Sequence, residues 1–309
     1  MMWPKSAAKF DEGWMAVIRQ GERLDIAHVI RPAGKRPQIR RCESFRIEKD
    51  EADALSRLAQ GRSLKRCRCV SLLDENDYRL VQLEAPKVLP EERVQAMRWR
   101  LKDLIDFPVD TAALAVVDIP TEGGRQANVF AVAAPAGLIG DRMALYHDVS
   151  VSLQAIDIPE MAVRNVAVLF EEENRGLAFL ALIEGDSLLT ITYRGELYLS
   201  RRIELSSTAL AQADDGKRAQ LLERLALELQ RTLDNFDRQY GFISVSRLLV
   251  ASEFDCDGTT AALAGNLYLP VQAVDLAQTL DFTALPELRS AERQAQSLLA
   301  IGAALRTDA

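Results

Sequence analysis

The chain has 309 residues, 48% of them hydrophobic, which is enough to build one large domain or two of medium size. Its net charge of −7 and its pI of about 5.2 argue against non-specific binding to nucleic acid, so we expect no nucleic-acid partner. No stretch reaches the roughly 20 apolar residues that cross a bilayer, and residues 1–10 lack the apolar core of a secretory signal. We therefore expect a cytosolic protein, or one that another protein recruits to a membrane.

The cysteines and histidines are too few for the sites that they usually build. The four cysteines are irregularly spaced, which does not suit a disulfide framework, and Cys67 and Cys69 share one face of a predicted strand, as core residues do. A zinc site would need further ligands, but His28 and His147 are each isolated in the sequence. We expect no metal ion, and no Ser-His-Asp or Cys-His catalytic group.

Three consecutive strands and then a helix are predicted near the start of the chain. The apolar runs are interrupted at Gly21 and at residues 32–37, which carry turn signals. The same order returns after Gly176, where three strands lead to a helix at 217–240 with an apolar face of helical period. The first set comprises strands at 14–20, 23–30 and 38–47 and a helix at about 50–60, and the second comprises strands at 176–184, 187–193 and 196–205.

Strands and helices then alternate to the end of each half. In the first half they are a strand at 128–134, a helix at 136–148, a strand at 151–158 and a helix at 159–170. In the second they are a strand at 246–252, a helix at 259–266, a strand at 268–274 and a helix at 289–305. This duplicated order predicts an α/β protein of two similar lobes on mixed sheets. We place the lobes at 1–170 and 171–288, and a C-terminal helix at 289–309 that packs back towards the first lobe.

An additional segment at about residues 75–127 interrupts the first half. It predicts a strand, a helix and a strand, and hence an inserted β-α-β subdomain. Its helix begins near Pro90 and ends before Pro108. Trp99 lies about 140° from Val94, off the apolar stripe, so it is either covered by another element or offered to a partner. The stripe consists of Val94, Met97, Leu101, Leu104 and Ile105.

The charge is distributed unevenly along the chain. Residues 31–68 contain twelve Lys or Arg and five Asp or Glu, a local charge of +7, so the remainder carries −7 − 7 = −14. Because the basic residues alternate with apolar ones, as on a half-exposed strand, we interpret this segment as a solvated face. An anionic membrane surface or an acidic partner is the alternative.

Three stretches carry a family resemblance. They are QAMRWRLKDLIDFPVD in the predicted inserted helix, SVSLQAIDIPEMAVRNVAV before the second lobe, and LQRTLDNFDRQYG in the long helix of that lobe. In this order and spacing they resemble the PilM family of type IV pilus assembly. The resemblance implies a two-lobed actin-like fold, related to ribonuclease H, which the cytoplasmic domain of GspL shares.

The resemblance also implies a function and a partner. PilM-like proteins are cytoplasmic adaptors that receive the short N-terminal tail of a PilN-like inner-membrane protein. They hold it in a groove between the first lobe and the inserted subdomain. We therefore expect a PilN-like partner, and membrane association only through that partner. The candidate partner-binding residues are Arg98, Trp99 and Arg100, among which Trp99 is the strongest because a tail in a groove needs apolar anchors.

Actin-like ATPases hold nucleotide between their lobes with two glycine-containing hairpins, and their backbone N–H groups cradle the phosphates. The stretch that matches the first hairpin places Arg19 where the family has Asp, then Gly21, and then Glu22 where the family has a small hydroxyl residue. Both changes disfavour Mg²⁺ and phosphate.

The family's nucleotide site has two more elements, the second hairpin and a Gly-Gly step after a strand of the second lobe. In this sequence both carry acidic residues, which also disfavour nucleotide. The second hairpin reads Glu184-Gly185-Asp186, with two carboxylates and no Lys or Arg in the turn to offset them. Glu253 stands where a Gly-Gly step would admit adenosine. We interpret the cleft as a degenerate nucleotide site, and expect a pseudo-ATPase without cofactor or catalytic residues. The alternative is an active actin-like ATPase with an atypical site that drives pilus assembly.

Overall fold

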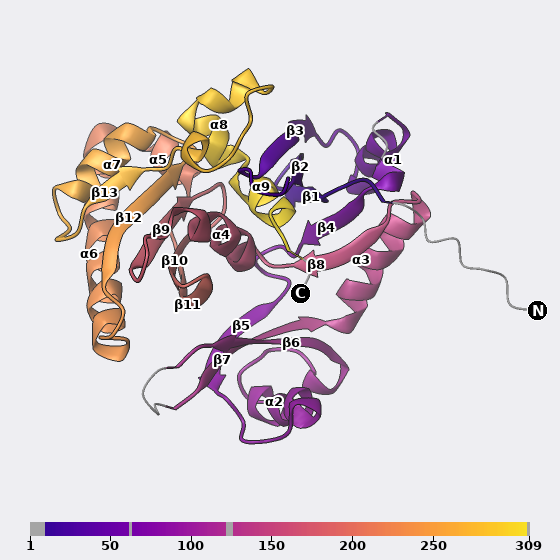
Figure 1. Cartoon of the computed structure of the whole chain (residues 1–309), viewed down its shortest axis with the longest axis horizontal. Helices are drawn as coiled ribbons and strands as arrows, with labels where there is room; N and C mark the ends of the chain where they lie inside the picture. Colours follow the sequence, from indigo (N-terminus) through magenta and orange to yellow (C-terminus); the bar gives the residue numbers. More distant parts are fainter. Residues whose placement is uncertain (1–9, 62–63, 122–125, 308–309) are drawn as a thin grey trace, which may run out of the picture.

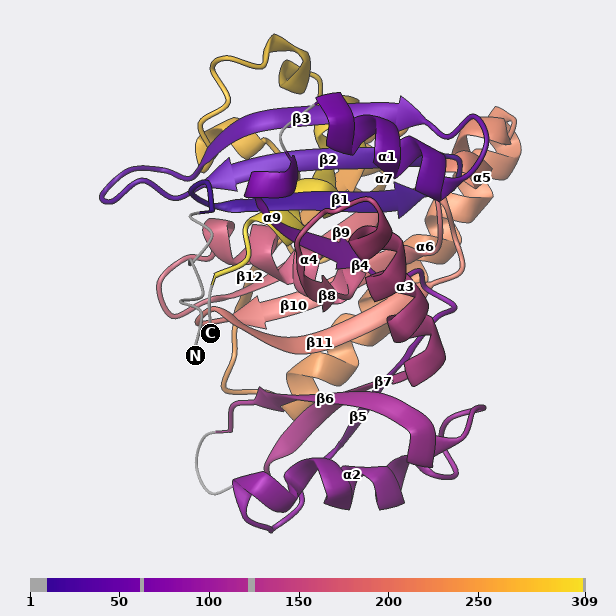
Figure 2. The same ribbon diagram turned by 90° about the vertical axis from the view of Figure 1, so that its right-hand side faces the viewer.

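The computed structural model describes residues 10–61, 64–121 and 126–307. Two five-stranded sheets form two lobes, and a three-stranded sheet extends from them (Figures 1 and 2). The prediction that the chain begins without a secretory signal concerns residues 1–10, nearly all of which lie outside the described residues. Within the described ranges, no helix combines the length and the apolar character needed to span a bilayer.

The first lobe is built on a sheet with the strand order β3-β2-β1-β4-β8. Strands β1 to β3 are antiparallel, whereas β4 and β8 continue the sheet in parallel with β1. Strand β1 is apolar without interruption because Ala16 and Ile18 face one core while Met15 and Val17 face another. The strands are β1 (Trp14–Gln20), β2 (Arg23–Ile30), β3 (Gln38–Arg46), β4 (Arg68–Leu72) and β8 (Leu153–Asp157).

Helices cover both faces of the first sheet. On one face, α1 (Glu51–Gly61) and α3 (Ala136–Asp148) bury Leu55 and Tyr146 against β1 and β2. On the other, α4 (Pro159–Ala167) packs against the C-terminal helix α9 (Leu298–Ala304), which also lies on β1 and β2. The end of the chain therefore packs on the first lobe, although it follows the second (Figure 1).

The second lobe repeats this plan with the strand order β11-β10-β9-β12-β13. The long helix α6 packs on it through an apolar face that includes Leu225, Leu229 and Phe236, at the predicted helical period. Its strands are β9 (Gly176–Leu182), β10 (Ser187–Tyr193), β11 (Glu196–Ile203), β12 (Val245–Ser252) and β13 (Val271–Ala273). Its helices are α5 (Ser207–Gln212), α6 (Asp215–Gln239), α7 (Cys256–Ala264) and α8 (Ala291–Gln296). Short 3-10 turns lie at Leu64–Arg66, Pro90–Glu92, Val109–Thr111, Val168–Phe170, Leu276–Gln278 and Pro286–Arg289.

The inserted sheet contains one strand more than predicted. Strand β7 (Asn128–Pro135) lies between β5 (Arg79–Glu84) and β6 (Ala112–Ile119), so the insertion is β-α-β-β and extends past residue 127. From the sequence, this strand was assigned to the first-lobe repeat, and its central residues from Val129 to Ala134 are all apolar. This pattern arises because the central strand is buried on both faces, with Val129 towards α2 and Phe130 towards the second lobe.

Two predicted helices differ in extent from the observed ones. Helix α2 (Arg93–Leu101) ends well before Pro108, and of its predicted stripe Met97 and Leu101 are buried while Val94 and Leu104 are exposed. Two core residues suffice to seat so short a helix on a three-stranded sheet. The predicted helix at 289–305 is divided at Ser297 into α8 and α9. The boundaries of the two lobes, at 170 and 288, stay a prediction.

Candidate functional site

The hairpins of the two lobes face each other across a cleft. Gly21 forms the turn between β1 and β2 with φ of +54°, and Gly185 follows Glu184 in the turn between β9 and β10. A Cβ atom on Gly21 would lie only 2.8 Å from Oε1 of Glu184, so the two turns are in contact. Together with Arg19 they line a cavity of about 400 Å³ between the lobes.

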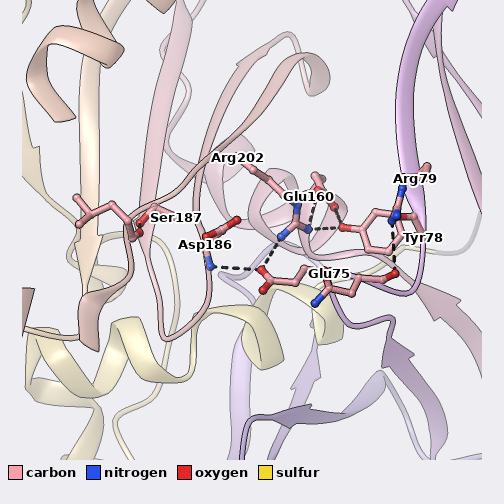
Figure 3. Close-up of polar contacts among 9 residues, drawn as sticks. Glu75, Tyr78, Arg79, Glu160, Asp186, Ser187 and Arg202 are labelled. Atoms are coloured by element: carbon pink, nitrogen blue, oxygen red, sulfur yellow. Dashed lines mark hydrogen bonds and ion pairs between the residues drawn. The ribbon is translucent and has the colours of Figure 1, made fainter. Parts of the chain in front are cut away.

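A carboxylate of the first lobe occupies the second hairpin. Oε2 of Glu75 accepts a hydrogen bond from the backbone N–H of Asp186 at 3.3 Å, and Arg202 donates to the same oxygen at 3.1 Å (Figure 3). A Cβ atom on Gly185 would lie 3.0 Å from this oxygen. The backbone N–H of Asp186, in the turn of the second hairpin, is therefore already bound to an anion of the chain itself.

Arg202 connects the two lobes through further polar contacts. From β11 it donates to Oε1 of Glu160 at 2.9 Å and to the hydroxyl of Tyr78, which in turn donates to Oε2 of Glu160 (Figure 3). Glu160, at the start of α4, is only 1% exposed, so its charge needs these partners. Burial, followed by the charge of Glu160, raises the pKa of Tyr78 far above its usual value and keeps the hydroxyl protonated.

A second cluster lies behind the first hairpin. The guanidinium of Arg23 is 3.6 Å from Glu184 and 4.0 Å from Glu253. It is also 3.7 Å from Asp25, which is 1% exposed. Burial raises the pKa of Glu253 to about 7; Arg23 opposes this rise, while Glu184 and Asp25 add to it. Arg23 thus stands among three carboxylates, and the charge of Arg293 also acts on Asp25.

The residues predicted for the degenerate cleft are only partly brought together. Arg19, Gly21, Glu184 and Gly185 line the cavity, whereas Glu253 lies beside it in the cluster around Arg23. Glu22 is not among the residues that line this cavity. Its side chain is 81% exposed and pairs with Arg46 on the surface.

Sequence reasoning missed the residues that close the cleft. The second hairpin has no cation of its own, but Arg202 from β11 and Arg23 from β2 supply positive charge from other elements. Glu75 and Tyr78 belong to DENDY, the polar segment directly after buried strand β4. Polar residues at the carboxyl end of a buried parallel strand are a usable signal for a site, and this one was passed over.

An apolar groove lies between the inserted subdomain and the first lobe. It has a volume of about 250 Å³ and is bounded by β6, β7, α3, β8 and α4. Ala115 and Val117 of β6 form one wall, and Ile139 of α3 and Met161 of α4 contribute to the other. Within the described part of the chain, β6 pairs with β7 alone, so it is an edge strand of its sheet.

The three predicted partner-binding residues lie on α2, away from this groove. Helix α2 covers the face of the inserted sheet that bears Val129, whereas the groove opens on the face that bears Val132. Trp99 is 72% exposed, which decides between the two alternatives of the sequence analysis in favour of an uncovered side chain. Arg98 donates to the carbonyl of Val109, and Arg100 donates to that of Glu84 at 2.7 Å, so both guanidinium groups secure the subdomain itself.

Comparisons with known proteins connect this geometry to solved structures. No protein-family model and no curated protein sequence matches the chain. A structure described as the PilM–PilN type IV pilus biogenesis complex matches with a TM-score of 0.72 and 19% identity, over 95% of this chain and 98% of that one. The chain therefore has the two-lobed actin-like fold, as the sequence analysis predicted.

Two further matches are more distant. The cytoplasmic domain of EpsL, an inner-membrane component of the type II secretion system of Vibrio cholerae, matches with a TM-score of 0.48 and 13% identity, over 92% of this chain and 94% of that one. A protein of unknown function with an actin-like ATPase fold, from Bacteroides thetaiotaomicron, matches with a TM-score of 0.49 and 8% identity, over 94% of this chain and all of that one.

Proposed function

We propose that the protein is a non-catalytic adaptor of a type IV pilus assembly platform that binds the cytoplasmic tail of a PilN-like inner-membrane protein. The observation that carries this proposal is the likeness of fold, over 95% of the chain, to the structure described as a PilM–PilN complex. Two local features support it: an apolar groove in which a tail can lie, and a cleft between the hairpins in which Glu75 already binds the backbone N–H of Asp186.

The groove has the properties that an extended tail requires. Its lining is apolar, with Ala115, Val117 and Ile139 available to apolar anchors of a peptide. Strand β6 borders it as an edge strand, and main-chain groups of such an edge bind an added strand in many peptide complexes. We assign the tail to this groove. Trp99, on the opposite side of the inserted sheet, remains a candidate for a second contact with the partner.

The cleft is suited to holding the lobes together. Glu75 lies against Gly185, and Glu184 lies against Gly21, so a carboxylate stands at each of the two glycines where phosphates would lie. A triphosphate would have to displace both and would meet their charge. The second candidate, an ATPase with an atypical site, is favoured by the 400 Å³ cavity and by Arg19 and Arg202 in its lining.

The resemblance of the sequence also supports a finer assignment. The sequence resembles that of MshI, the PilM-like component of mannose-sensitive haemagglutinin pili, so we assign the adaptor to a platform of the MSHA type. In this assignment the protein is cytoplasmic and reaches the inner membrane only through its partner.

The test measures binding of a synthetic peptide with the N-terminal sequence of the PilN-like partner. Ala115→Arg places a charged side chain in the groove at an exposed position and is expected to weaken binding by more than about 1 kcal/mol. Trp99→Ala truncates another exposed residue, on the opposite side of the sheet. If Trp99→Ala abolishes binding while Ala115→Arg leaves it unchanged, the tail lies on α2 and the assignment to the groove fails.

Calorimetry with MgATP on the same preparation separates the two candidate functions. The adaptor is expected to bind the peptide with the same affinity in the presence and absence of MgATP, and to show no heat of nucleotide binding. A micromolar Kd for MgATP would favour the ATPase and would show that Glu75 and Glu184 yield to phosphate.

A further inference from the structure

A cavity of about 890 Å³ lies beside the turn between β2 and β3, apart from both the cleft and the groove. One wall comes from the first lobe, at residues 30–40, and the other from the segment at 277–289 that follows the second-lobe sheet. The β2–β3 turn projects beyond the end of its sheet (Figure 2), and the segment at 277–289 contributes the other wall of the cavity beside it. The cavity therefore lies between the two halves of the molecule, as the cleft between the hairpins does, but at a different place.

Backbone hydrogen bonds fix the two walls together. The N–H of Asp281 donates to the carbonyl of Pro37 at 2.9 Å, and the N–H of Ile39 donates to the carbonyl of Asp281 at 2.8 Å. Arg36 reaches across and donates to the carbonyl of Ala277 at 3.1 Å. These contacts shape the cavity without a ligand.

The floor of the cavity is apolar and its rim is basic. Ile30, Leu280 and Phe282 are buried beneath it, at 7%, 2% and 8% exposure. Four exposed cations surround the opening with two carboxylates between them, a balance of 4 − 2 = +2 in a chain whose net charge is −7. The cations are Lys35, Arg36, Arg40 and Arg289, and the carboxylates are Glu12 and Asp281.

The carboxylates offset this rim only in part. One oxygen of Asp281 accepts hydrogen bonds from the N–H and the hydroxyl of Thr283, at 3.1 and 2.7 Å, and the other accepts one from Gln38 at 3.3 Å. The hydrogen bonds from Thr283, and then the charges of Arg40 and Arg36, lower the pKa of Asp281, while Lys35 and Arg289 add further exposed positive charge. Like charges gathered around a hollow raise the local concentration of anions.

We propose that this cavity binds a phosphate ester that carries an apolar group. A phosphate monoester has a charge of about −1.5 to −2 at neutral pH, which matches the balance of the rim. Guanidinium groups bind phosphate oxygens in a bidentate manner, and the buried floor accepts the apolar group. The volume lies within the range of small-molecule sites. The ester has two possible sources, a soluble phosphorylated compound and a phospholipid head group.

This site gives the basic segment a role that the adaptor function does not supply. From the sequence, residues 31–68 were interpreted as a solvated face, with binding to an anionic membrane surface or to an acidic partner as the alternative. In the structure, three of the four rim cations come from that segment, and Arg289 joins them from the far end of the chain. A ligand held by both walls would stabilise their contact.

The test uses phenyl phosphate as the probe, with calorimetry at about 0.15 M salt to screen weak surface attraction. The wild-type protein is expected to bind it more tightly than inorganic phosphate, which lacks the apolar group. Arg40→Ser combined with Arg289→Ser removes one cation from each wall and is expected to weaken binding by about tenfold or more. Both side chains are exposed, so the fold is retained, and Lys35→Ser provides an independent variant.

The matched control is Arg175→Ser combined with Arg231→Ser, which removes two exposed cations far from the cavity in sequence and leaves the net charge equal to that of the test variant. The proposal is overturned if phenyl phosphate does not bind, or if the control loses as much affinity as the test variant. Co-sedimentation with vesicles of phosphatidylcholine that contain phosphatidic acid, a phosphate monoester, distinguishes the sources. Vesicle binding that phenyl phosphate competes away identifies a lipid, and binding of phenyl phosphate without vesicle binding identifies a soluble ligand.

Discussion

At the scale of single residues, Glu253 is the side chain whose charge is most at odds with its surroundings. It is largely buried, with Glu184 and Asp25 nearby and with Arg23 as its cation. Its pKa is raised to about 7 from 4.5, so the folded protein holds this proton to a higher pH than the unfolded chain does. Ionisation of Glu253 therefore lowers the free energy of unfolding as the pH rises between these two values.

Glu253→Gln removes this dependence on pH. At pH 8 the variant is expected to be more stable than the wild type by about 1–3 kcal/mol, and the difference should vanish below about pH 4, where Glu253 is protonated in both the folded and the unfolded protein. Urea unfolding across this pH range measures it. Glu22→Gln is the control because Glu22 is 81% exposed on the surface. A gain that is the same at every pH would mean that the change acts through packing rather than through charge.

At the scale of elements, the packing of α4 against α9 depends on one glycine. A Cβ atom on Gly302 would lie 2.1 Å from the carbonyl oxygen of Ala162, closer than any real contact. The carbonyl of Gly302 also accepts a hydrogen bond from Asn165 at 3.0 Å. The C-terminal helix can lie this close to α4, and hence on the first lobe, only because position 302 has no side chain.

Gly302→Ala is expected to destabilise the protein by about 2–4 kcal/mol, because a backbone carbonyl cannot move aside as a side-chain end can. Gly140→Ala is the matched control. It lies in the middle of α3 with no atom within 4 Å of the added Cβ, and is expected to stabilise by about 0.5–1 kcal/mol through helix propensity. Thermal unfolding compares the two. Equal effects of both substitutions would contradict the close approach of α9.

The elements also show what the sequence could predict. Strands β1, β2 and β10 were predicted with their observed limits because apolar and turn residues alternate clearly there, and the apolar face of α6 followed from its period. The pairing of β7 with β5 and β6 could not be predicted, since a strand buried on both faces has the same pattern in any sheet. The contact of Arg202 with Glu75 joins residues 127 positions apart, a distance that no local pattern records.

At the scale of the whole molecule, Arg202 is one of the residues that join the two lobes, and it contacts a carboxylate that is almost fully buried. It comes from the second lobe, while Glu75 and Glu160 belong to the first. Because Glu160 is almost fully buried, loss of Arg202 would leave its charge unpaired inside the protein.

Arg202→Met is expected to lower the free energy of unfolding by about 2–4 kcal/mol, reduced from the full cost of breaking a buried pair because Arg202 is 26% exposed. Adding Glu160→Gln removes the unpaired charge and is expected to recover at least half of the loss. A double-mutant cycle by urea unfolding measures the coupling. Strictly additive losses would mean that the two residues do not interact, and that another contact holds the lobes.

Strand β7 and helix α3 are joined directly, and this bears on the entropy that the proposed tail would lose on binding. Strand β7 ends at Pro135 and α3 begins at Ala136, so no loop residue lies between the inserted sheet and the helix that borders the groove. A direct joint leaves few residues to absorb a rotation, so we expect the groove to keep its shape when a tail binds as proposed. The entropy lost on binding then falls on the tail alone. A tail stiffened in its extended form, for example by proline outside the hydrogen-bonded positions, should bind more tightly without any new contact.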